Sequence, residues 1–145
     1  MHPLSQSSLQ DFIESQRRYQ LRYLLRLAWP APQAEPMLEN ELRLRRGAAF
    51  HRLLHQHYLG IPREALEAGR MTPPLDRWWR AHQDSVPPLL AELGGGLRLY
   101  PEITLAGAFH GRRLFARYDL LAVVPGKRLL IFDWKTSSRR PRRTW

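Results

Sequence analysis

The feature that most constrains this chain is a pair of aspartates, Asp119 and Asp133, each placed in an apolar, strand-like segment. A Pro125-Gly126 turn lies midway between them, so an antiparallel hairpin would bring the two carboxylates side by side. Side chains alternate between the faces of a strand, so Asp133 and Lys135 are predicted to share one face and Trp134 to occupy the other. The hairpin therefore offers two anionic oxygen ligands for a hard divalent cation, with an ammonium beside them. That is the set that metal-assisted phosphodiester hydrolysis requires.

Length and composition exclude several classes of protein. The 145 residues suit one domain, and the absence of cysteine excludes disulfides, thiolate zinc sites and cysteine-ligated iron–sulfur clusters. No apolar run approaches the roughly 18 residues of a membrane span, and the N-terminus lacks the pattern of a signal peptide. We therefore expect a cytoplasmic protein without membrane partners.

The charge of the chain points to a polyanionic partner. Lys and Arg number 23 against 13 Asp and Glu, which gives a formal charge of +10. From Arg112 to Trp145 there are ten basic residues and two acids, Asp119 and Asp133. Such a field attracts nucleic acid first, although a solvated basic surface is the alternative. The candidate phosphate contacts are Arg112, Arg113, Arg117, Arg139, Arg140, Arg142 and Arg143.

Apolar periodicity predicts helices in the first two thirds of the chain. The first is expected to begin at Ser8, in a Ser-x-x-acid pattern with Asp11, and to end before Pro30. A second is expected at about 39–58, a short one at 64–68, and another at 74–93 that Pro87-Pro88 interrupts. The tryptophans of Trp78-Trp79 are either core residues or platforms for base stacking.

After Gly94-Gly95-Gly96 the pattern becomes that of strands. Residues 97–109, 113–124 and 128–132 are β-rich and separated by turns at His110-Gly111 and Pro125-Gly126. The expected fold class is α/β, with N-terminal helices followed by a mixed or antiparallel β-meander. Residues 1–145 are expected to form a single domain, with a mainly helical part at 1–93 and a sheet at 97–136 that carries the active site.

Two further residues are candidates for the same site. Glu102 lies on the first expected strand, where a solvated or ion-paired role is the alternative. His51 lies on the second expected helix and could add one imidazole nitrogen to an oxygen-rich site. His51-x-x-x-His55 has helical metal-ligand spacing, but Arg52 stands where His-Glu-x-x-His proteins carry their glutamate, which argues against a zinc hydrolase.

Taken in order, these residues resemble the PD-(D/E)XK nuclease superfamily, specifically its RecB-like branch of recombination and CRISPR-associated exonucleases. The resemblance covers nearly the whole chain. The matching motifs are the Ser7-to-Phe12 helix start, the aromatic and basic Arg18-to-Tyr23 segment, Gly47-x-x-x-His51, Glu102, Ala116-x-x-Asp119 and Asp133-x-Lys135-Thr136. The resemblance implies a restriction-endonuclease-like core.

The resemblance also implies a role for each site residue. His51, Asp119 and Asp133 would hold Mg²⁺ or Mn²⁺, and the Trp134 carbonyl would add a backbone oxygen. Lys135 would orient or deprotonate the attacking water, or steady charge on the phosphate. Glu102 would assist as an outer or second-metal ligand.

The sequence departs from the family pattern at three places. Ala116 replaces a glycine, and the cysteines that bind an iron–sulfur cluster in some relatives are missing, so no cluster is expected. The Gln-x-x-x-Tyr helix that follows in the family would lie beyond Trp145, so we expect the C-terminal helix to be missing from this chain.

The function predicted from the sequence is a metal-dependent nuclease acting on single- or double-stranded DNA in repair, recombination or defence, with a helicase or recombination protein as partner. The first alternative is a catalytically inactive nucleic-acid-binding module of the same fold. The second is a basic RNA-binding or ribosome-associated protein, which would have no metal site.

Overall fold

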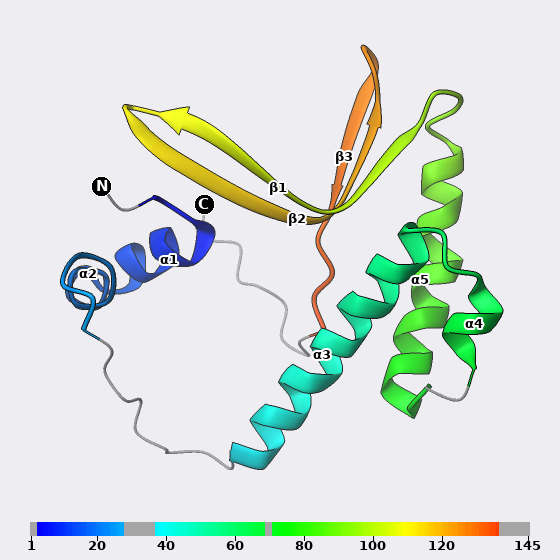
Figure 1. Ribbon diagram of the computed structural model, residues 1–145, viewed down its shortest axis with the longest axis horizontal. Coiled ribbons are helices and arrows are strands. Elements are labelled where there is room, and N and C mark those ends of the chain that lie inside the picture. Colours follow the sequence, from blue (N-terminus) through cyan, green and yellow to red (C-terminus); the bar gives the residue numbers. More distant parts are fainter. Residues whose placement is uncertain (1–2, 28–36, 69–70, 137–145) are drawn as a thin grey trace. The chain divides into compact units, whose positions relative to one another are not determined.

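A computed structural model describes residues 3–27, 37–68 and 71–136 of the chain (Figure 1). The residues fall into two compact units. The N-terminal unit comprises Met1–Pro36 and Ile103–Arg117, and the C-terminal unit comprises Met37–Glu102 and Tyr118–Trp145. Within the described ranges, no helix is long and apolar enough to cross a membrane.

The N-terminal unit begins with helix α1 (Gln6–Glu14), followed by the short helix α2 (Gln16–Tyr19) and the π-helix η1 (Gln20–Leu24). Helix α1 starts from a capping box: the Ser5 hydroxyl accepts from the Ser8 N–H at 3.3 Å, and the Ser8 hydroxyl accepts from the Ser5 N–H at 2.8 Å. The predicted start at Ser8 was therefore wrong. Ser8 is the third helical residue, and its side chain is buried because it closes the box.

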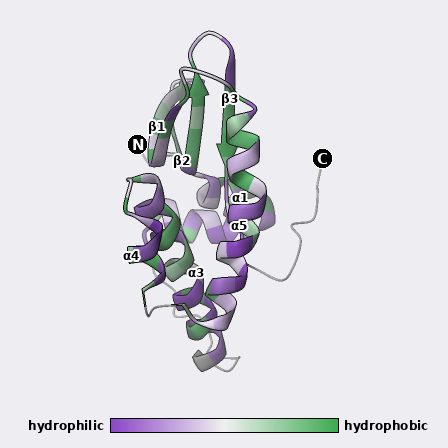
Figure 2. Cartoon of the chain, turned by 90° about the vertical axis from the view of Figure 1, so that its right-hand side faces the viewer, coloured by the Kyte–Doolittle hydropathy of each residue, from purple (hydrophilic) through white to green (hydrophobic). Residues whose placement is uncertain are grey.

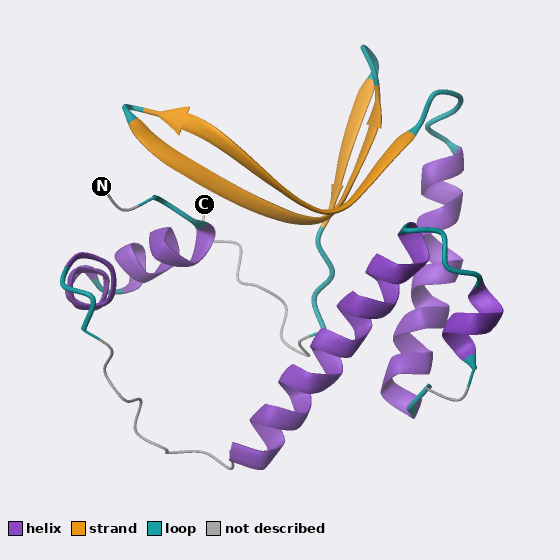
Figure 3. Ribbon diagram, viewed as in Figure 1, coloured by secondary structure: helices purple, strands orange, loops and turns teal. Residues whose placement is uncertain are grey.

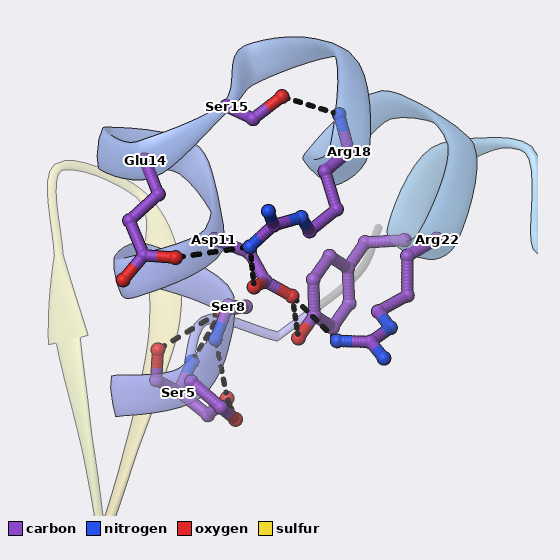
Figure 4. Close-up of polar contacts among 9 residues, drawn as sticks. Ser5, Ser8, Asp11, Glu14, Ser15, Arg18 and Arg22 are labelled. Carbon is purple, nitrogen blue, oxygen red and sulfur yellow. Dashed lines mark hydrogen bonds and ion pairs between the residues drawn. The ribbon is translucent and has the colours of Figure 1, made fainter. Parts of the chain in front are cut away.

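A buried carboxylate, Asp11, ties η1 to α1. Its Oδ2 accepts from the Arg22 guanidinium at 2.8 Å and from the Tyr23 hydroxyl at 3.1 Å (Figure 4). The Arg22 hydrogen bond is the main reason that the pKa of Asp11 lies below its ordinary value, with Tyr23 and Arg18 adding to the effect. The carboxylate stays ionised and gives the short helices a common anchor.

The sheet contains β1 (Arg98–Phe109), β2 (Arg112–Val124) and β3 (Arg128–Phe132) in the order β1-β2-β3. The turn between β1 and β2 has positive φ at both His110 and Gly111, the type I′ geometry that matches the twist of a hairpin. Strands β2 and β3 are antiparallel, in a register that pairs Leu120 with Phe132 and Val124 with Arg128. The strands follow the helices along the chain, as the sequence predicted, and Figure 3 shows them as a meander.

The C-terminal unit adds three helices, α3 (Met37–Tyr58), α4 (Arg63–Glu67) and α5 (Pro73–Ala91). Helix α5 continues through Pro87-Pro88, so the predicted interruption was wrong. Two prolines remove two backbone donors, but Val86 and Leu90 on either side are buried in a cluster with Ala122 of β2. Packing on the sheet outweighs the local cost. Figure 2 shows the hydrophobic residues of β2 and β3.

A second core cluster joins α3, α4 and α5, with Phe50, Leu53, Leu54, Leu66 and Trp79 as its buried members. Trp79 is 1% exposed, and its indole N–H donates to Glu67 at 2.8 Å. Trp78 packs against the same cluster. The interpretation of Trp79 as a core residue is confirmed, because its ring has no open face to offer a base.

The buried His82 of α5 makes stability depend on pH. Its Nε2 is hydrogen-bonded to the Tyr58 hydroxyl at 2.8 Å, and burial lowers the pKa of His82 to about 4, with nearby His57 adding to the effect. The unfolded chain takes up this proton near pH 6.5 and the folded chain only near pH 4. Stability is therefore fully present above pH 6.5 and falls as the pH drops toward 4, by up to about 3 kcal/mol.

His82→Gln keeps a polar partner for Tyr58 but cannot titrate, so its unfolding free energy should vary less between pH 6.5 and 4 than that of the wild type. Urea unfolding at a series of pH values measures this difference. Since the carboxylates titrate equally in both proteins, parallel curves would contradict the assignment of the effect to His82.

Candidate active site

One face of α3 carries the residues that hold the candidate site. Gly47, His51 and Tyr58 lie four and seven residues apart, which places them on the same side of a helix. The residues before Gly47 are exposed from Glu39 to Arg46, whereas the stripe containing Gly47, Phe50 and Leu54 is buried. The C-terminal half of α3, which carries the candidate site, is thus the half that packs into the core.

Asp119 on β2 is held from two sides. Its Oδ1 lies 3.2 Å from His51 Nδ1, and its Oδ2 accepts from the Trp134 backbone N–H at 2.8 Å. The last pair in the register is Leu120 with Phe132, so the next would set Asp119 opposite Asp133. Strand β3 ends at Phe132, and the Asp119 side chain takes the Trp134 N–H. The predicted hairpin is confirmed.

The Trp134 ring anchors the segment that follows β3. It stacks on Tyr58, with ring centroids 6.0 Å apart and planes 18° apart, and on Phe132 at 6.0 Å and 14°. His82 meets it edge-on at 5.6 Å. Tyr58 and His82 are also hydrogen-bonded to each other. The Trp134 ring therefore packs against a polar pair of fixed geometry as well as against apolar carbon atoms.

The surroundings of Gly47 explain why the Gly47-x-x-x-His51 pattern has a glycine at its first position. A Cβ at this position would lie 2.8 Å from Thr136 Oγ1, closer than atoms pack. A residue without a side chain therefore lets α3 approach the end of the Asp133-Trp134-Lys135-Thr136 segment. Together, Gly47, His51 and Tyr58 contact Thr136, Asp119 and Trp134, which fixes the segment against the helix.

Asp133 and Lys135 lie on the opposite face of this segment from Trp134, as the alternation predicted. Both are about half exposed, and Lys135 Nζ donates to Asp133 Oδ1 at 2.7 Å. Across the described parts of the chain, no three His, Asp or Glu side chains gather closely enough to hold a metal ion. The structure thus joins His51 to Asp119, while the joining of Asp133 to them remains a prediction.

Glu102 stands in an unusual backbone conformation within β1. Its φ of 48° is one that non-glycine residues seldom adopt, and its carboxylate lies 3.9 Å from His55 Nδ1. His55 is one helical turn after His51, so α3 presents two histidines toward two strand carboxylates. The i, i+4 spacing of His51 and His55 was noted in the sequence, but His55 was not included among the candidate site residues. That spacing was the signal that would have placed it here.

The predicted phosphate contacts fall into two groups. Arg112, Arg113 and Arg117 are exposed on β2 but belong to the N-terminal unit, whereas the candidate site belongs to the C-terminal unit. Arg139, Arg140, Arg142 and Arg143 lie outside the described residues. Among the described residues, the predicted phosphate contacts therefore lie in the N-terminal unit, and the contacts at Arg139, Arg140, Arg142 and Arg143 remain a prediction.

Comparison with known families decides what this arrangement is. Residues 3–144 match the sequence model of the PD-(D/E)XK nuclease superfamily. The chain belongs to this superfamily. Its helices and antiparallel sheet have the α/β, restriction-endonuclease-like fold that the sequence predicted, and the superfamily generally hydrolyses phosphodiester bonds, typically with divalent metal ions. No curated protein and no solved structure matches the chain significantly.

The close approach of Gly47 and Thr136 yields a testable coupling. Gly47→Ala adds helix propensity, worth up to about 1 kcal/mol, but drives a methyl group into Thr136. In a Thr136→Ala background the obstructing hydroxyl is gone, and the same substitution should stabilise the protein. Denaturant unfolding of the four variants should give a coupling energy of about 1 kcal/mol.

Thr136→Val is the matched control because it keeps the volume of the threonine. Gly47→Ala should remain unfavourable beside valine. An effect of Gly47→Ala that is the same beside threonine, alanine and valine would show that the glycine does not serve this contact.

Proposed function

We propose that this protein is a divalent-metal-dependent nuclease of the RecB-like branch that hydrolyses DNA phosphodiester bonds. The observation that carries the proposal is the Asp119 carboxylate, held between His51 and the Trp134 N–H beside the Asp133-x-Lys135 segment. A purely structural role, such as filling the core or capping a helix, would not explain why Asp119, His51 and the Asp133-x-Lys135 segment lie at the same end of the sheet.

The proposed donor atoms are of the kinds that Mg²⁺ and Mn²⁺ bind. Asp119 and Asp133 would supply carboxylate oxygens, His51 an imidazole nitrogen, and Trp134 its carbonyl oxygen. When bound, such an ion polarises the phosphate and lowers the pKa of a coordinated water. Asp133 accepts a hydrogen bond from Lys135. Because the Asp133 side chain is half exposed, its carboxylate remains accessible to a ligand from solvent.

Lys135 supplies the positive charge of the site. Its ammonium is kept beside Asp133, where it would orient the attacking water or contact a phosphate oxygen as negative charge develops. Glu102 would act from the neighbouring strand as an outer ligand, with its carboxylate turned toward His55. The backbone strain at Glu102 agrees with a placement set by function rather than by the strand.

DNA is the proposed substrate because the chain combines a nuclease fold with a formal charge of +10. Electrostatic binding to phosphates is compatible with both single-stranded and double-stranded DNA. DNA repair, recombination or defence is the proposed setting, with a helicase or recombination protein as partner. The alternative is a nucleic-acid-binding module of the same fold that has lost catalysis.

Substitutions in the Asp-x-Lys segment test the catalytic proposal. Cleavage should require Mg²⁺ or Mn²⁺ and stop with a chelator. Asp133→Asn should lower both Mn²⁺ affinity, measured by calorimetry, and cleavage of labelled DNA. Lys135→Ala should leave Mn²⁺ affinity nearly unchanged but slow cleavage by about 10²–10³-fold, because its contact forms chiefly in the transition state.

Asp84→Asn on α5 removes another exposed carboxylate and is the matched control, with both properties expected at wild-type levels. A wild-type protein that binds Mn²⁺ and DNA but cuts neither strand form would favour the binding module. Wild-type cleavage in the presence of excess chelator would contradict the metal requirement.

A further inference from the structure

Among the described residues, the excess of positive charge lies mainly in the N-terminal unit. The described residues of the N-terminal unit include seven arginines and only two acids, Asp11 and Glu14. Those of the C-terminal unit include eleven Lys and Arg against ten Asp and Glu. The excess of the N-terminal unit therefore does not serve to balance acids, and it comes from two stretches of sequence. The arginines are Arg17, Arg18, Arg22, Arg26, Arg112, Arg113 and Arg117.

The fold joins the two stretches. Leu4 forms a parallel bridge with Leu114, its N–H donates to the Arg113 carbonyl at 2.8 Å, and its carbonyl accepts from the Phe115 N–H at 2.9 Å. The segment leading into α1 is thus hydrogen-bonded to β2 beside Arg112 and Arg113. These backbone bonds belong to one unit and hold basic residues from both ends of the chain in a single structure.

Two of the helical arginines are held in place by a buried acid. Arg22 Nη1 lies 2.8 Å from Asp11 Oδ2, and Arg18 Nη1 lies 3.5 Å from Asp11 Oδ1 and 2.9 Å from Glu14 (Figure 4). Asp11 is only 8% exposed, whereas the Arg18 and Arg22 side chains are 53% and 63% exposed. The acid lies beneath, and much of each guanidinium surface remains open to solvent.

This arrangement reduces the entropy that a ligand would otherwise have to overcome. An exposed arginine samples many rotamers, while one that is bonded to a buried carboxylate keeps its planar fork in a narrower range. A guanidinium has five N–H donors, and the Asp11 and Glu14 contacts use only part of this set. Donors remain for an anionic ligand that approaches from the solvent side.

We propose that the α1–α2–η1 region is a binding surface for the phosphate backbone of nucleic acid, with Arg17, Arg18 and Arg22 as its centre. The assignment of the ligand rests on the proposed function, since a nuclease must grip a polyphosphate chain. All seven cations of the unit are arginines, whose forks match phosphate oxygens in a bidentate manner, and no lysine is present among them. Backbone contacts carry no base information, so the binding is independent of sequence.

The salt dependence of binding tests the surface. Arg17→Gln/Arg18→Gln/Arg22→Gln removes three charges while leaving side chains that still donate hydrogen bonds. Anisotropy of a labelled oligonucleotide, with chelator present to prevent cleavage, gives log K against log salt between about 50 and 200 mM. Each lost phosphate contact lowers the slope by about 0.7 on a single strand and about 0.9 on a duplex, so the variant should lose about 2 and about 2.7.

The matched control is Arg43→Gln/Arg45→Gln/Arg80→Gln. It removes the same charge from exposed arginines of the C-terminal unit, which form i, i+4 ion pairs with Glu39, Glu41 and Asp76. The control should keep the wild-type slope. Equal losses in both triple variants would show a net-charge effect and overturn the proposal, as would an unchanged slope in the N-terminal variant.

A second variant guards against loss of fold. Arg17→Gln alone leaves the Asp11 contacts intact, because Arg17 bonds the amide of Gln20. If circular dichroism shows the triple variant unfolded, this single variant should still lower the single-strand slope by about 0.7, and an unchanged slope overturns the proposal. Competition by polyglutamate as effective as by DNA at equal charge would also overturn it.

Binding without cleavage keeps the two proposals distinguishable. A reduced slope in a protein that never cuts DNA would support the surface and reject the nuclease. A protein that cuts DNA with a slope unaffected by these arginines would support the nuclease and reject the surface.

Discussion

The hydrogen bonds to the Asp119 carboxylate are the interaction on which the candidate site depends. The sheet ladder ends with the Leu120–Phe132 pair, so the residues that carry Asp133 and Lys135 have no continuing strand to hold them. The Asp119 carboxylate replaces the missing ladder bond by accepting from the Trp134 N–H at 2.8 Å. A hydrogen bond to a charged group contributes about 1.5–3 kcal/mol, more than a neutral ladder bond. A side chain that we propose as a metal ligand thus also serves as a structural acceptor, and removing it should affect both roles.

Helix α3 makes this arrangement specific. An apolar ring alone can pack on Trp134 in several ways, because dispersion contacts have little directional preference. The Tyr58–His82 hydrogen bond is directional, and it fixes the ring on which Trp134 stacks. Burial raises the pKa of the Tyr58 hydroxyl, so the hydroxyl stays protonated and the pair stays neutral. Gly47 sets the distance of closest approach at the other end of the same face.

The sequence predicted the hairpin because two signals agree there: apolar, strand-like segments around Asp119 and Asp133, and a Pro125-Gly126 turn midway between them. Trp134 and its charged neighbours alternate as expected even though β3 has already ended. What failed were local rules that tertiary contacts override. Pro87-Pro88 did not break α5, since Val86 and Leu90 bury against the sheet, and Ser8 was displaced as the helix cap by Ser5. The roles of His55, Tyr58 and His82 depend on partners far away in the chain, which periodicity does not identify.

The nearly balanced charge of the described residues around the candidate site bears on its chemistry. Arginines beside Asp119 or Asp133 would pair with those carboxylates and compete with a divalent cation for the same oxygens. The C-terminal unit has nearly equal numbers of acids and bases among its described residues, and its exposed arginines pair with helical acids such as Glu39 and Glu41. Lys135 is the cation bonded to Asp133, and a single flexible ammonium moves aside at lower cost than a bidentate guanidinium. Arg18 and Arg22 pair with Asp11, so the proposed binding surface would attract nucleic acid without using these arginines to neutralise the carboxylates that a metal would need.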